Sequence, residues 1–388
     1  MPDLARLRAL FPITERYVYL SHAGSGPLPL PTVKSLAQTA ETKSLEGDLN
    51  YQAAEAVTEK TREMAARLMK VDPAGIAFIK NTSAGAIIAI NSIEWHPGDN
   101  VILMKDAFPT HTYAFNYMLP NVEKRFVTSA DLAEGPDCVY RLCDKHTRCV
   151  AIDWVHFYSG IRADISAIGH FCREMNIWFL VDAIQGLGPV DFDFGALEAD
   201  FVYAGCNKWL LSPHGIGLLY VNPGRLDQLK PANLGWLSAQ WKEFNDIYTE
   251  KPMKSGANRY EEGTKNYPAI YALGESLRII LEVGSAEIDR HVRRLVDILR
   301  KELLAAGFEI TTPEEPKRSA GIITCCKPGA CNASIHAWLK AANMICSLRQ
   351  DHLRIAPYFY NTEEEIRRFV ARAAEPAALT AKPSDCKT

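Results

Sequence analysis

The stretch YAGCNKWLLSPHGIGLLYV, residues 203–221, decides the fold. It places Lys208 between a strand-like run and a Gly-rich apolar run, although lysine is among the residues least often buried. Similar apolar runs recur through the middle of the chain, and segments with helical spacing such as 165–176 separate them. Strands that alternate with helices form βαβ units and a mostly parallel sheet, with functional residues at the carboxyl ends of its strands. The predicted strands are 101–106, 149–155, 177–183, 200–206 and 215–221.

The pattern changes after residue 221, where a long irregular segment is followed by three helical patterns. The first of these helices ends at Gly284, a residue type typical of helix C-caps. A length of 388 residues is long for one hydrophobic core and favours two domains or a large domain with a smaller lobe. We expect an N-terminal segment (1–20) that packs on the small domain, a large domain (21–255) and a small α+β domain (256–388). The helices predicted for the small domain are 266–284, 286–307 and 363–379, and its predicted strands are 321–326 and 353–359.

Composition excludes several classes of function. The formal net charge is −3 and the pI is near 6.4, so no nucleic-acid or anionic-membrane surface is indicated. The start of the chain does not resemble a signal peptide, and no window approaches the length of a membrane span. The ten cysteines form no CxxC pair and no zinc-ligand pattern. We therefore expect no metal site, reduced and mostly core-filling cysteines, and a cytoplasmic location.

Two charged residues stand where apolar strands end. Asp182 follows four apolar residues, and a carboxylate there costs several kcal/mol unless a cation meets it. Lys208 follows the next predicted strand, and a partly buried lysine with a lowered pKa is a nucleophile for Schiff-base chemistry. A cofactor with an aldehyde and a pyridinium nitrogen would satisfy both residues. A purely structural ion pair between the two is the alternative.

A third signal is IKNTSAGAIIAI, residues 79–90. Here a polar turn opens an apolar helix, and the free N–H groups of such a helix N-terminus bind phosphate. Thr82 and Ser83 add hydroxyl groups to this turn. Plain N-capping is the alternative, but it needs one hydroxyl rather than several.

Together these elements resemble the fold-type-I pyridoxal-phosphate (PLP) enzymes of aminotransferase class V. That group includes cysteine desulfurases, selenocysteine lyases, kynureninases and isopenicillin-N-epimerase-like proteins. The resemblance spans nearly the whole chain and implies a large domain with a mostly parallel, seven-stranded sheet sandwiched by helices. The matching pieces, in chain order, are YLSHAGSGPLP, NTSAG, VHFYSGIRADI, VDAIQGLG, NKWLLSPHGIGLLYV, RYEEGTKN and LRIAPYFYNTEEEI.

The resemblance also implies roles for residues around the cofactor. Lys208 would be the covalent anchor of PLP and, once released, would move the Cα proton of the substrate. Asp182 would keep the pyridine nitrogen protonated, and Gln185 would hydrogen-bond the ring phenolate. Ser83 and Thr82 would hold the phosphate.

Further roles follow for the substrate and for a second subunit. Thr264 in EEGTKN would reach the phosphate of a neighbouring subunit, which implies a homodimer with shared active sites. Arg354 in LRIAP would bind the carboxylate of a small-molecule amino-acid substrate; an ordinary surface arginine is the alternative. Phe108 falls where the family stacks an aromatic ring on the cofactor. His22 would line the substrate entrance unless it is merely solvated, and His156 faces either the cofactor or the core.

The chain departs from the family pattern in two places. Asn207 and Gly205 stand where histidine and serine usually bind phosphate, so Asn207 can donate only through its amide and Gly205 only through its backbone. The segment before Arg354 also lacks the extended loop that carries the persulfide cysteine of desulfurases, and Cys346 reads as a core residue. A cysteine desulfurase is thus disfavoured.

The expected function is PLP-dependent chemistry at the Cα of an amino acid or a similar metabolite, by transamination or β-elimination of the C–S lyase type. An epimerase-like reaction and a kynureninase-like hydrolysis are the alternatives. A non-catalytic protein of this fold is disfavoured because Lys208, Asp182, Gln185 and Arg354 are all present. A dinucleotide-binding dehydrogenase is set aside because no GxGxxG follows a strand.

Overall fold

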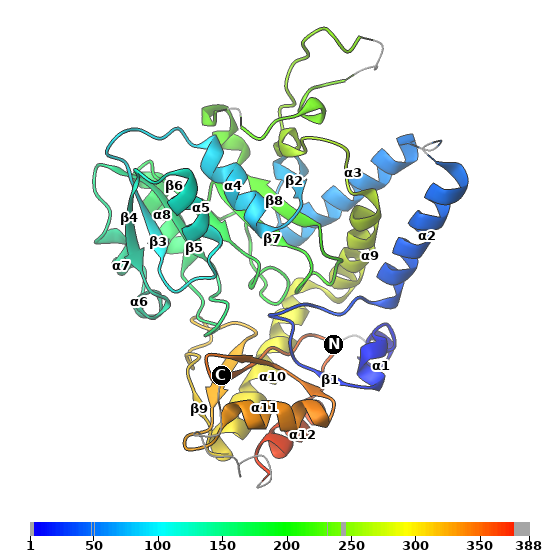
Figure 1. Cartoon of the computed structure of the whole chain (residues 1–388), viewed down its shortest axis with the longest axis vertical. Helices are drawn as coiled ribbons and strands as arrows, with labels where there is room; N and C mark the ends of the chain where they lie inside the picture. Colours follow the sequence, from blue (N-terminus) through cyan, green and yellow to red (C-terminus); the bar gives the residue numbers. More distant parts are fainter. Residues whose placement is uncertain (1–3, 48, 50, 231, 242–245, 376–388) are drawn as a thin grey trace.

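A computed structural model describes residues 4–47, 49, 51–230, 232–241 and 246–375. A seven-stranded sheet forms the larger part of the molecule, and a smaller sheet lies below it (Figure 1). In the large sheet β8 runs in the opposite direction to the other six strands. In spatial order its strands are β2 (Ile76–Ile79), β8 (Gly217–Val221), β7 (Phe201–Gly205), β6 (Trp178–Asp182), β5 (Thr147–Asp153), β3 (Asn100–Met104) and β4 (Glu123–Val127).

All five strands predicted for this sheet are present, and β2 and β4 complete it. The strand β4 lies at the edge of the sheet and buries only Val127, so its sequence shows no apolar run. The strand β2 is buried throughout but is only four residues long. Hydrophobic patterning in the sequence detects neither an exposed edge strand nor a very short strand.

Alternate residues of the central strands face two separate hydrophobic cores. In β3, for example, Val101 and Leu103 belong to one core, whereas Ile102 and Met104 belong to the other. Helices α4 and α5 cover the first face, and helices α3, α6, α7 and α8 contribute to the second. These helices are α3 (Tyr51–Met69), α4 (Thr82–Ser92), α5 (Thr110–Met118), α6 (Ser129–Glu134), α7 (Asp137–Tyr140) and α8 (Ile165–Glu174).

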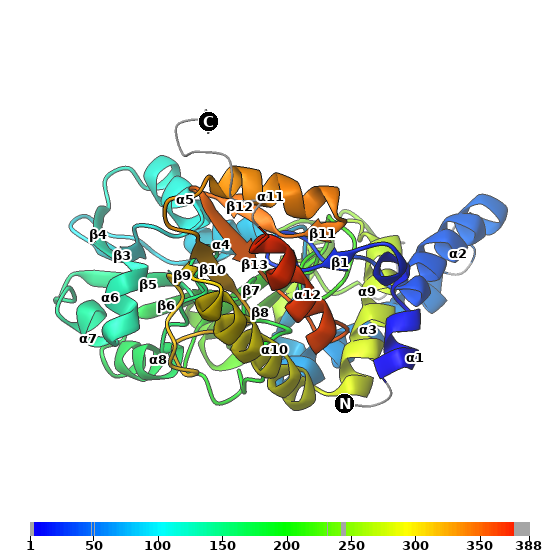
Figure 2. The same cartoon turned by 90° about the horizontal axis from the view of Figure 1, so that it is seen from below.

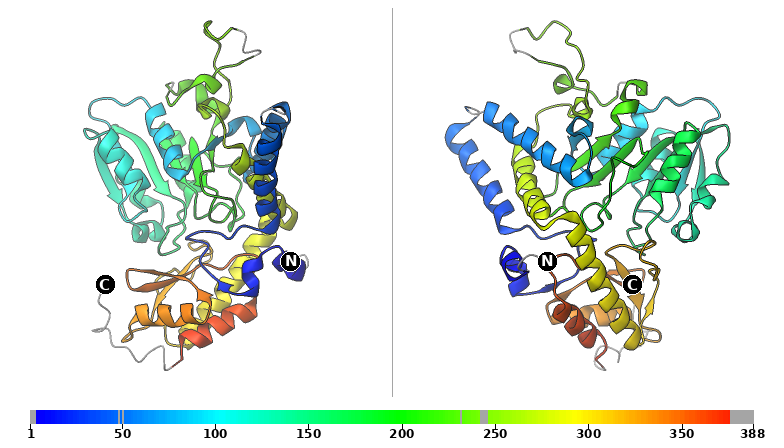
Figure 3. Two further views of the ribbon diagram at one scale, coloured as in Figure 1. Left: turned by 45° about the vertical axis from the view of Figure 1, so that its right-hand side comes forward. Right: turned by 180° about the vertical axis from the view of Figure 1, so that it is seen from behind.

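Helix α9 (Tyr267–Val283) lies against α2 (Leu30–Glu46) and α3, as both views of Figure 3 show. It ends at Gly284, as the sequence predicts, and the positive φ of 88° there favours glycine. Ser276 on α9 donates a hydrogen bond to the carbonyl of Leu211, just beyond Lys208. The helix thereby fixes the loop that carries the lysine. The domain limits given above stay a prediction.

The small antiparallel sheet has the strand order β12-β13-β10-β9, with helices α10, α11 and α12 on its outer side (Figure 2). The N-terminal residues contact this part of the chain, since Arg8 donates to the Tyr360 carbonyl and to the Glu365 carboxylate, each at 2.8 Å. The elements are α1 (Leu4–Ala9), α10 (Ser285–Ala305), α11 (Asn332–Ala341), α12 (Glu363–Ala373), β9 (Glu309–Ile310), β10 (Ile323–Cys326), β12 (Ser347–Arg349), β13 (His352–Ile355) and the pair β1 (Val18–Tyr19) and β11 (Met344–Ile345).

Two predictions about this region need correction. Helix α12 ends at Ala373 rather than at residue 379, because Pro376 disfavours helical backbone in the residue before it; residues 376–379 lie outside the described part of the chain. Cys331 is disulfide-bonded, so the expectation of reduced cysteines is wrong at that position, although eight others are free thiols. In the part of the chain that the structure describes, no helix combines the length and apolar character needed to cross a membrane.

Candidate active site

Lys208 follows the carboxyl end of β7 by three residues, in the loop that leads back into β8. Its Nζ lies 6.0 Å from the centre of the Phe108 ring. Burial lowers the pKa of Lys208 to about 8, and the attraction of Asp182 only partly opposes this shift. A substantial fraction of the amine is therefore neutral, and so nucleophilic, near neutral pH.

Asp182 is the last residue of β6, and its carboxylate accepts a hydrogen bond of 3.0 Å from the backbone N–H of Ile184. Burial raises the pKa of Asp182 to about 6, whereas the Ile184 N–H and Lys208 favour its charged form. At neutral pH the group is thus an anion placed close enough to Lys208 to influence it. The structure therefore brings Asp182 and Lys208 into one site.

The loop of Lys208 is held by Gly26 and by Gln185. The N–H of Gly26 donates to the Asn207 carbonyl at 2.9 Å, and a Cβ on Gly26 would lie only 2.1 Å from the Lys208 carbonyl oxygen. The Gln185 amide donates to the Ala23 carbonyl at 3.0 Å and accepts from the Trp209 indole at 2.9 Å. Both ends of Gln185 therefore already have partners, and its contact with the cofactor ring stays a prediction.

The N-terminus of α4 lies beside the end of β7. Asn81 caps the helix by accepting from the Ala84 N–H at 2.9 Å, and Thr82 accepts from the Gly205 N–H at 2.9 Å. A Cβ on Gly205 would be 3.3 Å from the Thr82 hydroxyl, so glycine permits this close approach. Ser83 is exposed at the start of the helix. Thr82 and Ser83 thus lie at a helix N-terminus, where anions bind favourably.

Arg354 on β13 is buried and reaches toward the large sheet. It donates to the Phe157 carbonyl at 2.7 Å and to the Ser347 hydroxyl at 3.4 Å, while its buried Nε has no partner. Burial, together with the nearby Arg349, lowers the pKa of Arg354 to about 10. An incompletely paired, buried guanidinium has hydrogen-bonding capacity left for a carboxylate. The charge of Arg354 also lowers the pKa of Lys208, which places the two groups in one site.

Phe108 is about half exposed and packs edge-on against Phe157, with ring centroids 5.6 Å apart. Its ring is thus free on the side toward solvent while remaining near Lys208. This position agrees with a ring that contacts a ligand bound at the lysine.

The two histidines are engaged within the protein. His22 is fully buried, and its nitrogens contact the Ala356 carbonyl at 3.0 Å and the Tyr360 hydroxyl at 2.7 Å. His156 is buried between the Ser159 hydroxyl and the Asp106 carbonyl, each at 2.7 Å. Burial lowers the pKa of both, so both rings are neutral. Both rings are buried and have protein partners, and their predicted roles in substrate binding stay predictions.

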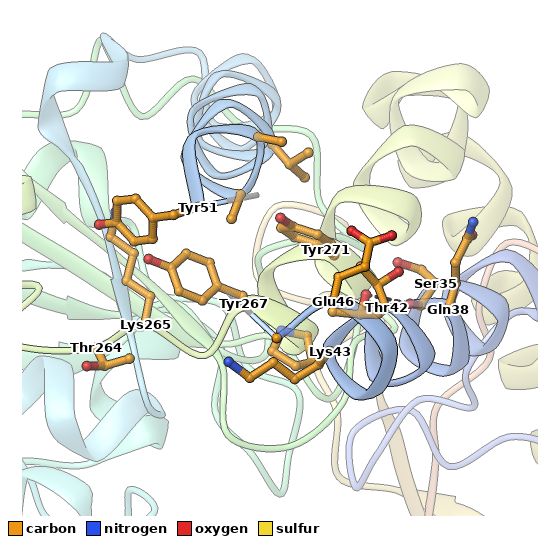
Figure 4. Close-up of a pocket in the computed structure, with 16 residues that line it drawn as sticks. Ser35, Gln38, Thr42, Lys43, Glu46, Tyr51, Thr264, Lys265, Tyr267 and Tyr271 are labelled. Atoms are coloured by element: carbon orange, nitrogen blue, oxygen red, sulfur yellow. Dashed lines mark hydrogen bonds between the residues drawn. The ribbon is translucent and has the colours of Figure 1, made fainter. Parts of the chain in front are cut away.

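Thr264 is exposed and lies on the wall of a cavity of about 630 Å³ between α2, α3 and α9 (Figure 4). It also lines a second cavity together with Ala84 and Ile88 of α4. Nearby in the first cavity Lys265 and Tyr267 both bond to Glu55, at 2.6 Å each. The contact of Thr264 with a neighbouring subunit stays a prediction.

Three site residues were missed by the sequence argument: Asp153, His111 and Tyr203. Asp153 ends β5 and stands next to Asp182 in the sheet register, and Asp182 stands next to Tyr203. His111 on α5 contacts the Tyr203 hydroxyl from the covering helix layer. The signal for Asp153 was present, because it follows an apolar run just as Asp182 does. His111 and Tyr203 carry no comparable signal, since only the packing of α5 on the sheet brings them together.

Comparisons with known proteins identify the family and the fold. The aminotransferase class-V family matches residues 18–369. An uncharacterised aminotransferase of Schizosaccharomyces pombe is 28% identical over 80% of this chain and 79% of its own. The isopenicillin N epimerase of Streptomyces clavuligerus is 26% identical over 90% of this chain and 92% of its own. Among solved structures, a PLP-containing form of the cystine C–S lyase C-DES superimposes with a TM-score of 0.89, at 22% identity over 97% of this chain and all of that one.

The chain belongs to the aminotransferase class-V family of PLP-dependent enzymes, and its fold is that of the fold-type-I PLP transferases. The residues present fit PLP as cofactor: a lysine with a lowered pKa, a buried carboxylate at the adjacent strand end, and a helix N-terminus with two hydroxyl groups. The predicted fold class and cofactor are therefore confirmed.

Proposed function

We propose that the protein acts on the Cα of a free α-amino acid, and that its principal reaction is β-elimination of the C–S lyase type. This proposal rests on one observation: the anion of Asp182 and the guanidinium of Arg354 both lie close enough to the Lys208 amine to change its pKa. A single site thus combines a base, a counter-ion for a pyridinium and a group for a carboxylate.

Bound PLP withdraws electrons from Cα and so weakens the bonds to that atom. Asp182 would hold the proton on the ring nitrogen through its charge, and Thr82 and Ser83 with the N-terminus of α4 would hold the phosphate. Arg354 would bind the carboxylate of the substrate and thereby orient its Cα–H bond toward Lys208. The free amine of Lys208 would then take the Cα proton, which its lowered pKa permits near neutral pH.

The choice of β-elimination is supported by the similarity to a protein named as a cystine C–S lyase. Transamination is the second candidate, because the relative in Schizosaccharomyces pombe is named an aminotransferase. Both reactions begin with removal of the Cα proton. They differ in the outcome that follows, since elimination releases a substituent from Cβ, whereas transamination transfers the amino group. Epimerase-like and kynureninase-like reactions remain alternatives with the same first step.

A desulfurase reaction through a cysteine nucleophile is not favoured. Cys346 is buried, and burial raises the pKa of its thiol to about 12. The turn at Gln350 and Asp351 joins β12 directly to β13, so no extended loop precedes Arg354. A buried, protonated thiol on a short hairpin is a poor nucleophile.

The active form is proposed to be a homodimer in which Thr264 of each subunit contacts the phosphate bound by the other. The exposed position of Thr264 beside a cavity supports this arrangement.

The test is the absorption spectrum of the purified PLP enzyme before and after addition of single amino acids, without a keto-acid acceptor. β-Elimination predicts that β-substituted amino acids such as cystine release ammonia and a keto acid while the cofactor band recovers. A stable conversion of the cofactor to its pyridoxamine form would instead show transamination. No response to any α-amino acid would refute the proposal.

A further inference from the structure

Three polar side chains lie side by side on the face of the large sheet that α4 and α5 cover. Asp153, Asp182 and Tyr203 are register partners across β5, β6 and β7. Alternation along each strand puts all three on the same face, because their neighbours two residues earlier, Ala151, Leu180 and Phe201, belong to one core. All are buried. Two carboxyl groups therefore meet on adjacent strands with little water around them.

His111 extends this row from the helix layer above it. One of its ring nitrogens, Nε2, contacts the Tyr203 hydroxyl, and the other, Nδ1, lies 3.8 Å from Oδ1 of Asp153. Neither Nδ1 nor this Oδ1 has a hydrogen-bond partner, and both are buried. Buried polar atoms almost always find partners, and a shift of about 1 Å would join these two.

The charge on Asp153 follows from its surroundings. Burial and the neighbouring charges of Asp182 and Asp106 raise its pKa well above the ordinary range, while the Phe108 N–H and Lys208 only partly oppose this shift. Burial also lowers the pKa of His111 to about 4, so the His111–Asp153 contact is not an ion pair at neutral pH. Two adjacent buried carboxyls do not both ionise readily, and the proton stays on the one with the higher pKa.

We propose that Asp153 is a positioning residue that stays protonated against His111 and Tyr203, so that the pair of carboxyls carries one negative charge and this charge rests on Asp182. The Asp153 hydroxyl donates to Nδ1 of His111, and Nε2–H of His111 donates to the Tyr203 oxygen. This arrangement gives a hydrogen-bond partner to Nδ1 of His111 and to Oδ1 of Asp153, the two buried atoms that lack one. Asp182 would then meet the pyridine nitrogen of bound PLP without a second anion beside it, and such an anion would raise the pKa of Asp182 further. The inference rests on the PLP chemistry proposed above but not on which reaction follows.

The test compares the urea unfolding of the full chain, without added PLP, for the wild type and Asp153→Asn between pH 5 and 8. Asparagine mimics the neutral acid and cannot ionise. In the folded wild type Asp153 holds a proton that the unfolded chain releases, so the wild type loses stability as the pH rises. The ratio of the wild-type unfolding constant to that of the variant should therefore rise about tenfold per pH unit. A ratio that stays constant with pH means that Asp153 is ionised in the folded protein, and it overturns the proposal.

A matched control is Asp200→Asn, which removes a buried carboxyl that is paired with Arg225 at 3.3 Å. Burial raises the pKa of Asp200 only to about 6, so for this variant the ratio should stop rising above pH 6. The infrared spectrum of the wild type provides a measurement that needs no variant. A protonated-carboxyl band that persists at pH 8 supports the proposal, and the absence of such a band overturns it.

A second measurement compares PLP binding by Asp153→Asn and by a further variant, Asp153→Ala. Asp153→Ala leaves the His111 nitrogen and the Phe108 N–H without a partner, so this variant should bind PLP more weakly than the wild type. Asp153→Asn keeps a partner for both groups, and we expect it to bind PLP at least tenfold more tightly than Asp153→Ala. If both variants lose affinity equally, the carboxyl group does not act by staying neutral, and the positioning role is wrong. Neither unfolding nor PLP affinity depends on turnover, so failure here is distinguishable from failure of the proposed reaction.

Discussion

Replacing Lys208 by methionine removes a buried amine while keeping a side chain of similar length. Burial lowers the pKa of Lys208 from 10.5 to about 8 in the folded protein. Between these values the folded state binds fewer protons than the unfolded state, so the lysine costs stability at pH values below 8. This cost disappears as the pH rises through 10.5, the value for the unfolded chain. At 1.36 kcal/mol per pKa unit, the cost at pH 7 is about 3 kcal/mol.

We therefore expect the Lys208→Met apoprotein to be more stable than wild type by up to about 3 kcal/mol at pH 7, with the gain falling to near zero by about pH 10.5. Urea unfolding of both apoproteins across this range measures the difference. The control is Lys60→Met, because Lys60 is exposed and has no ion pair among the described residues, whereas Lys265 pairs with Glu55 and is not suitable. A constant difference for Lys208→Met at all pH values would refute the reasoning.

The same pKa predicts how fast the apoprotein captures its cofactor, since only the neutral amine attacks the aldehyde. At pH 7 about a tenth of Lys208 is neutral, roughly 300 times more than for a lysine with its ordinary pKa. The capture rate, followed by PLP absorbance in a stopped-flow instrument, should rise about tenfold per pH unit below pH 8 and level off above it. A rise that continues to pH 10 would show that the pKa of Lys208 is not lowered.

Three further substitutions test other parts of the site. Gly26→Ala places a methyl group 2.1 Å from the Lys208 carbonyl oxygen, and it should cost about 1–3 kcal/mol in urea unfolding and weaken PLP binding; unchanged values of both would contradict the close approach. Arg354→Lys keeps the charge but loses the planar fork, so KM for the amino acid should rise at least about tenfold with a smaller change in kcat; an unchanged KM would remove Arg354 from the substrate site. Cys346→Ala should leave kcat within about twofold because the thiol is buried and protonated, and loss of turnover would point to a desulfurase-like nucleophile.

Several features of this protein follow from the sequence alone. The strands that end at Asp182 and just before Lys208 show as apolar runs, because a strand covered by helices on both faces needs hydrophobic side chains throughout. The N-terminus of α4 was visible because capping residues and an apolar helix are local in the chain. These local patterns predicted a mostly parallel α/β sheet and a site for a cofactor with an aldehyde and a pyridinium nitrogen, and their resemblance to aminotransferase class V implied the fold class and PLP.

Other features depend on contacts between segments far apart in the chain. No local pattern shows that His22 is buried against Tyr360, or that Gln185 already bridges Ala23 and Trp209. The contact of His111 with Tyr203 likewise joins a covering helix to a strand 92 residues later. A polar residue reads the same in sequence whether its partners are protein, solvent or ligand, since hydrogen-bond partners are chosen by proximity in space. The sequence by itself therefore determined which chemistry the site can support, and only the packing of helices on the sheet decided which polar groups remain free to perform it.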